Sequence, residues 1–139
     1  MRGEPCPPVD NIRSEKAIQC RDAVAGYLQK VQDLDGMMAL GADGAEPALQ
    51  ALETMGKSGK IKFGTFDLSP VVLQALAKKQ MDFAVDQQQW LQGYLPVIFL
   101  ANHARYGLLP QGDSVLTGPA FVTPENAQRV IDLSKHGIR

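Results

Sequence analysis

Two acidic residues follow short apolar runs, at points where buried strands are predicted to end. Asp67 comes directly after residues 63–66, and Asp86, followed by Gln87, comes after residues 83–85. In an open α/β sheet, ligands bind just outside the carboxyl ends of the strands. A carboxylate at such a point can accept hydrogen bonds from ligand hydroxyls or hold a cation. Two polar strand ends about twenty residues apart therefore predict a binding crevice.

Predicted helices and strands alternate along the chain around these positions. Ser69 and Pro70 are typical of a helix start, and Gly107 of a helix end. Gly118-Pro119 interrupts residues 115–122, which predicts an edge strand or an interdomain crossing there, and Thr123 is expected to cap the last helix. We expect strands at 36–41, 60–66 and 81–85, and helices at 12–32, 46–55, 69–79, 88–106 and from 124 onwards. This alternation with short connections predicts an α/β fold with a mostly parallel sheet.

Composition narrows the class of protein. The chain has 139 residues, 45% of them hydrophobic and 21% charged, with a net charge of −1, which fits one globular domain. The near-neutral charge argues against a nucleic-acid partner. The longest apolar run, 94–101, is too short to span a bilayer, and residues 1–8 are polar without the apolar core of a secretory signal. We expect residues 1–12 to form an extended arm.

No residue set in the sequence predicts catalysis or a metal site. Cys6 and Cys20 allow either one disulfide or two free thiols, and neither has a second cysteine or histidine at metal-ligand spacing. His103 and His136 lie far apart, and no serine or cysteine has the context of a nucleophile elbow. The glycines of 41–45 are too loosely spaced for a phosphate-binding loop. We therefore expect a protein without a cofactor that is not an enzyme.

Five motifs together resemble the C-terminal portion of type I periplasmic sugar-binding proteins, the solute receptors of ABC importers, which are related to lac-repressor-type effector domains. The motifs are Asp35-Gly36-Met37-Met38-Ala39-Leu40-Gly41, residues 47–52, residues 63–67, Phe83-Ala84-Val85-Asp86-Gln87-Gln88 with Gly93-Tyr94, and Thr117-Gly118-Pro119. The resemblance implies one lobe of a periplasmic-binding-protein-like I fold, a three-layer sandwich with flavodoxin-like topology. Residues 13–139 would form this lobe.

The resemblance also implies which residues bind ligand. In the family a sugar is clamped between two lobes, and the contacts fall here on Asp67 and Gln87. A third contact, commonly an asparagine, falls on Gly41, so the sequence departs from the family there, and Asp43 is a candidate substitute. Phe66 and Trp90 are candidates for stacking on the sugar. The alternatives are that Phe66 and Trp90 pack in the core, that Asp67 and Asp86 cap helices, and that Gln88 and Gln89 face solvent.

The expected partners follow from the same resemblance. Family members are about twice as long, with two lobes, are periplasmic, and deliver sugar to an ABC permease. The helix at 88–106 would reach toward the absent lobe and expose Leu91, Leu95 and 98–100. Such a patch favours association. Two placements of this helix are open: it folds back onto its own sheet, or it swaps into a second chain. We expect a homodimer or higher oligomer that forms through this helix.

Three classes of function compete at this stage. The first is a sugar-binding module that is truncated and weak by itself. The second is an oligomeric interaction or effector-sensing module derived from the same fold, although no helix-turn-helix or basic patch is present. The third is a small flavodoxin-like enzyme or receiver, which would need an acidic pair, a further aspartate and a lysine at strand ends. The first is the function we predict.

Overall fold

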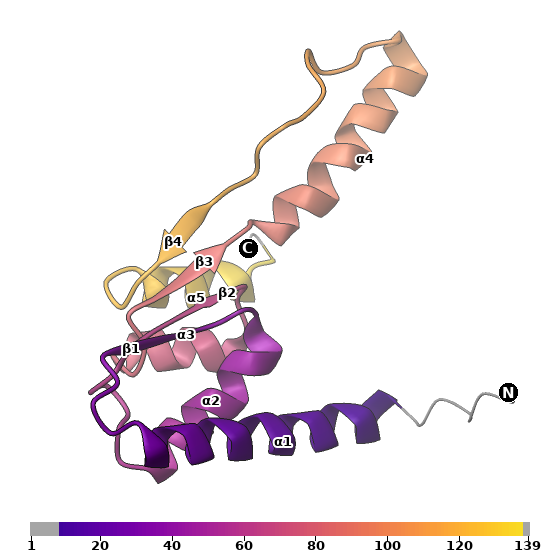
Figure 1. Ribbon diagram of the computed structural model, residues 1–139. Helices are drawn as coiled ribbons and strands as arrows, with labels where there is room; N and C mark the ends of the chain where they lie inside the picture. The colour runs from indigo at the N-terminus through magenta and orange to yellow at the C-terminus, as the bar shows by residue number, and fades with distance from the viewer. Residues whose placement is uncertain (1–8, 138–139) are drawn as a thin grey trace, which may run out of the picture.

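The computed structural model describes the backbone of residues 9–137 and the side chains from residue 15 onwards, arranged as in Figure 1. The helices and strands are, in order, α1 (Val9–Lys30), β1 (Gly36–Ala39), α2 (Ala42–Thr54), β2 (Lys62–Phe66), α3 (Pro70–Ala77), β3 (Phe83–Asp86), α4 (Gln89–Tyr106), β4 (Ala120–Val122) and α5 (Ala127–Lys135). Each element that the sequence predicted is present, with shifted ends.

The sheet has the order β1-β2-β3-β4, with the first three strands parallel and β4 antiparallel at the edge beside β3. The predicted α/β class, mostly parallel sheet and edge strand are therefore confirmed. Because β1, β2 and β3 run in one direction, their carboxyl ends meet at one edge of the sheet. Register pairs Ala39 with Thr65 and Phe66 with Val85, so the residues that follow these strands emerge side by side.

The starts of α1 and α2 differ from the sequence prediction. α1 begins at Val9, so residues 9–12 are helical rather than part of an extended arm; residues 1–8, and with them Cys6 and its possible pairing, lie outside the described residues. α2 begins at Ala42 instead of residue 46. The sequence pattern did not indicate this first turn, because Gly44 has a low helix propensity. Ser69 caps α3 as predicted, its Oγ accepting from the Val72 N–H at 3.2 Å.

The start of α5 is a further correction. Thr123 is not its cap: the helix begins at Ala127, with Asn126 at the N-cap position. The Asn126 side chain instead accepts from the Thr123 N–H at 2.8 Å and donates to the Phe121 carbonyl at 3.1 Å. These bonds hold residues 123–126 as a turn between β4 and the helix, which the cap pattern in the sequence did not distinguish from a first helical turn.

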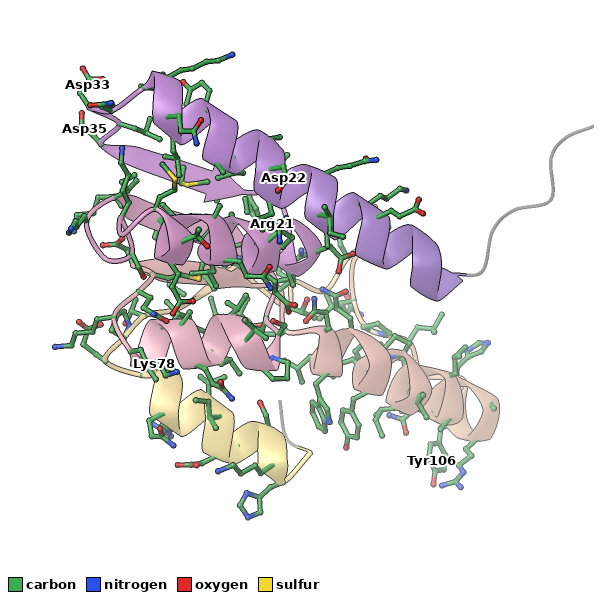
Figure 2. All side chains as sticks on the ribbon, turned by 90° about the horizontal axis from the view of Figure 1, so that it is seen from below. Arg21, Asp22, Asp33, Asp35, Lys78 and Tyr106 are labelled. Carbon is green, nitrogen blue, oxygen red and sulfur yellow. The ribbon has the colours of Figure 1, made fainter. Side chains whose placement is uncertain are left out.

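One face of the sheet packs against the helices and forms the core. Phe63, Ala84 and Val122 are fully buried there, because alternate residues of a strand point to the same face. Figure 2 shows α1, α2, α3 and α5 side by side across this face, an order that their mutual contacts confirm. Their contribution to the core is Leu28, Ala45, Ala48, Leu52, Val72, Leu76, Ala127 and Val130.

The other face of the sheet is less completely covered. Phe83 lies directly over Gly64 and meets Phe121 edge to face, with 6.0 Å between the ring centres. Phe121 is 58% exposed and Met38 46% exposed. Parallel strands are usually buried on both faces. In this sheet one face is covered by helices, and the other exposes Phe121 and Met38.

α4 leaves the sheet at the end of β3 and projects away from it, and residues 107–119, the return segment, run back along it to β4 (Figure 1). No residue of α4 is buried, and Tyr106 lies at its far end (Figure 2). Of the two placements expected for this helix, packing against its own sheet is therefore wrong. No helix in residues 9–137 is long and apolar enough to cross a membrane.

Candidate functional site

Asp67 and Gln87 meet at the carboxyl edge of the sheet. Asp67 follows β2 with a φ of 65°, which turns the chain out of the strand, and its N–H donates to the Val85 carbonyl at 2.9 Å. The Gln87 Nε2 donates to Asp67 Oδ1 at 2.7 Å. Because Ser69 is the residue that caps α3, the alternative role of Asp67 as a helix cap is wrong. The structure thus brings together two residues predicted for the site.

Gln89 is a member of this cluster that sequence reasoning missed. The side chain is exposed at the start of α4, as the solvent-facing alternative expected, and its Nε2 also donates to the same Asp67 Oδ1, at 3.0 Å. It reaches Asp67 because Gln88 has a φ of 56°, which redirects the chain before α4 begins. The run of three glutamines directly after a strand end was the available signal.

Gly41 completes the edge beside Asp67. A Cβ added at Gly41 would lie 4.0 Å from Asp67 Oδ2, so the loop after β1 lies against the carboxylate. Gly41, where the sequence departs from the family pattern, therefore lies beside the Asp67 carboxylate and contributes no side chain to the site.

The point where the chain leaves and re-enters the sheet is tightly bonded. The Gln87 carbonyl accepts from Gln92 Nε2 at 2.9 Å and from Thr117 Oγ1 at 3.0 Å. Asp86 is buried, and its Oδ1 accepts from the Gln88 N–H at 2.7 Å, which makes it a turn-forming residue rather than a helix N-cap. These bonds fix the backbone of Gln87, and through it the amide that contacts Asp67.

Two cavities flank the cluster and contain the candidate aromatic residues. A cavity of about 480 Å³ is lined by Trp90 and Gln89 together with Asp86, Ser69 and residues of α3 and α5. A second, of about 460 Å³, is lined by Phe66, Gln87 and residues 115–119 of the return segment. Trp90 is 41% exposed and stacks on Tyr94 with ring centres 4.7 Å apart, so neither candidate ring is a buried core residue.

Asp43 lies elsewhere. It belongs to the first turn of α2, is exposed, and lines a separate cavity of about 570 Å³ with Lys16 and Cys20 of α1. The early start of α2 is the physical reason, because it draws Asp43 into the helix that packs on α1. The structure therefore does not bring Asp43 into the cluster around Asp67.

The charge of the cluster is that of Asp67 alone. Both of its hydrogen-bond donors are neutral amides. The ion pairs among the described side chains join Arg21 to Asp22, Lys62 to Asp82 and Lys135 to Asp132, and none of them includes Asp67. No group of three metal-ligating side chains is found in residues 15–137. The arrangement suits recognition of hydroxyl groups by a carboxylate acceptor with amide groups beside it.

One carboxylate with a lowered pKa, Asp82, lies at the opposite edge of the sheet. Burial raises the pKa of Asp82, but hydrogen bonds from the Phe63 N–H and from Lys62, together with the Lys62 charge, lower it more. The bonds measure 2.8 and 2.9 Å. Asp82 joins the start of β2 to the turn before β3 and is therefore a structural group.

Comparison with known proteins gives a consistent result. A family model described as periplasmic binding protein domain matches residues 6–107. The xylose/arabinose-binding protein XylF of Sulfolobus acidocaldarius is 28% identical over 121 residues, which cover 84% of this chain and 30% of XylF. A carbohydrate transporter of Acidothermus cellulolyticus, solved in complex with myo-inositol, is 31% identical with a TM-score of 0.75, over 88% of this chain and 43% of that one.

A third similarity supports the fold alone. A sugar ABC transporter sugar-binding protein from Bacillus halodurans is 24% identical, with a TM-score of 0.72, over 81% of this chain and 42% of its own. The chain spans less than half the length of each of these three relatives.

Proposed function

The chain belongs to the periplasmic binding protein domain family, and from that membership we propose that it contributes one lobe of a non-catalytic, non-covalent sugar-binding site. The observation that carries the proposal is the Asp67 carboxylate held by the Gln87 amide at the carboxyl edge of three parallel strands. A hydroxyl that donates to a carboxylate forms a charge-assisted bond, worth about 1.5–3 kcal/mol.

Phe66 and Trp90 are proposed as the apolar contacts of the ligand. Each lines a cavity beside the cluster, and Trp90 with Tyr94 forms a stacked pair with an exposed ring. Aromatic rings pack against the apolar faces of sugar rings, which adds shape recognition to the polar contacts. Asp43 is left out of the proposed ligand set because it lines a different cavity.

The domain assignment that accompanies this proposal is a single lobe formed by residues 13–139, with the start of α1 at Val9 added. One lobe leaves the opposite side of the ligand open to water, so we expect this chain alone to bind sugars weakly, in the millimolar range. We further propose a periplasmic location and delivery of the ligand to an ABC permease, as membership of the family suggests.

A thermal-shift titration of the chain with D-xylose, L-arabinose and myo-inositol tests the proposal. A ligand that binds only the folded state stabilises it by about 2.7 kcal/mol at a hundredfold excess over its Kd. We expect a shift at tens of millimolar ligand that is lost in Asp67→Ala and kept in Asp43→Ala, a matched exposed aspartate in another cavity. A shift that survives Asp67→Ala contradicts the proposed site, and micromolar binding by a monomer contradicts the one-lobe proposal.

We also propose that this chain forms a homodimer or higher oligomer through α4. Val97 and Leu100 are 64% and 66% exposed, and the helix projects free of the sheet (Figure 1). Such a contiguous apolar surface favours association, either by swapping α4 or by pairing it. Sedimentation should show a dimer or larger species for the wild type and a monomer for Leu100→Glu. The control is Val71→Glu, which changes an exposed apolar side chain of α3 and should leave the oligomer intact. A monomeric wild type at 100 micromolar would contradict this proposal.

A further inference from the structure

The two oxygens of Asp67 are in different situations. Oδ1 accepts two hydrogen bonds, from Gln87 at 2.7 Å and from Gln89 at 3.0 Å, and a carboxylate oxygen has about two lone-pair sites. Oδ2 lies on the side of Gly41, where a Cβ would stand 4.0 Å away. The acceptor capacity that remains for a ligand is therefore concentrated on Oδ2.

The two amides also fix the direction of the carboxylate. Gln87 is held through its own carbonyl by Gln92 and Thr117, and Gln89 is fixed by its place in the first turn of α4. A carboxylate that two side-chain amides already hold in one orientation loses less freedom when a ligand binds, which favours affinity. Gln89 therefore acts through Asp67 and is a positioning residue.

We propose that Gln89, together with Gln87, orients Asp67 so that Oδ2 alone is presented to the ligand, in the space that Gly41 leaves open. This inference rests on the proposed sugar-binding function and specifies its ligand. The site takes a neutral polyhydroxy compound that donates one hydroxyl to Oδ2 and carries a ring substituent beside it, over Gly41. Because the charge of Asp67 is met by neutral amides, a ligand with a carboxylate at this point is rejected.

The contact is tested first without any ligand, by the side-chain amide ¹⁵N–¹H resonances of the unliganded chain. The resonances of Gln87 and Gln89 should both shift in Asp67→Ala and stay unchanged in Asp43→Ala. A Gln89 resonance that does not respond to Asp67→Ala overturns the inference, whatever the chain binds.

The positioning role is tested by titration with myo-inositol as the probe. Gln89→Ala should lower the affinity about two- to tenfold, the effect of one lost hydrogen bond, while Gln74→Ala on the exposed surface of α3 should not change it. An affinity unchanged in Gln89→Ala overturns the inference. If myo-inositol, D-xylose and L-arabinose all fail to bind the wild type, the proposed function and the ligand specified here both fail, and the resonances still decide whether the contact exists.

Charge and size selection test the ligand class that the proposal specifies. D-Glucose should bind the wild type at least about tenfold more tightly than D-glucuronate, and Asp67→Asn should narrow that ratio. Gly41→Ala should weaken myo-inositol binding and leave the urea midpoint of the chain unchanged, since a Cβ at residue 41 meets only an ordinary contact distance. Equal binding of D-glucose and D-glucuronate, or unchanged binding by Gly41→Ala, contradicts the proposed ligand class.

Discussion

Replacing Gly118 with alanine tests how closely the return segment approaches the end of β3. A Cβ built at Gly118 lies 3.0 Å from the Asp86 carbonyl oxygen and 3.3 Å from the Gln87 Cα. Both neighbours are backbone atoms of the segment that leads into α4, so neither can rotate away as a side chain would. Gly118 has no positive φ, so the alanine backbone itself is not strained, and the expected effect comes from the close approach.

The magnitude follows from these distances. To restore ordinary contacts the two segments must separate by a few tenths of an ångström, which strains the 3.0 Å bond from Thr117 Oγ1 to the Gln87 carbonyl. Overpacking of this kind costs about 1–3 kcal/mol, and a neutral hydrogen bond contributes about 1 kcal/mol net. We therefore expect Gly118→Ala to lower the free energy of unfolding by about 1–3 kcal/mol.

Urea unfolding followed by circular dichroism measures the effect. Gly93→Ala is the matched control, because Gly93 lies in α4 with no atom within 4 Å of its added Cβ. Alanine there should be neutral or stabilise by up to about 1 kcal/mol through helix propensity. A Gly118→Ala variant with an unfolding free energy within about 0.5 kcal/mol of the wild type would refute the close approach of the two segments.

Three further predictions concern the elements that hold the site. Ser69→Ala removes the cap of α3 and should cost about 1 kcal/mol in urea unfolding, whereas an unchanged midpoint would mean that the Val72 N–H finds another acceptor. Because the pKa of Asp82 is lowered, its carboxylate stabilises the fold above the ordinary aspartate pKa, and this effect is lost as pH falls through the folded-state pKa. Between about pH 5 and 3 the free energy of unfolding should therefore fall more for the wild type than for Asp82→Asn. Parallel profiles of unfolding free energy against pH would contradict this. Gly64→Ala places a Cβ against the Phe83 ring and should destabilise by about 1–3 kcal/mol. Phe83→Leu in the same chain should recover part of the loss, and no recovery would locate the strain elsewhere.

The strand ends were predictable because they depend on local signals. Apolar runs that stop at Asp67 and Asp86, with Ser69-Pro70 behind the first, identify buried strands followed by helix starts. The residues that follow parallel strands share one edge of the sheet, so Asp67 and Gln87 were expected to lie together. In the structure Gln87 Nε2 lies 2.7 Å from Asp67 Oδ1. The caps at Ser69 and Gly107 were predicted for the same local reason.

The tertiary structure decided what depends on backbone direction and on distant partners. The turn at Gln88 brings Gln89 to Asp67, and its positive φ has no signature in a glutamine-rich run. The early start of α2 removes Asp43 from the site, and contact with α1 stabilises that first turn. The sequence did not determine the placement of α4 away from the sheet either. An apolar helix pattern indicates only that the helix can pack against some surface, and the direction in which the chain leaves β3 is a property of the tertiary structure.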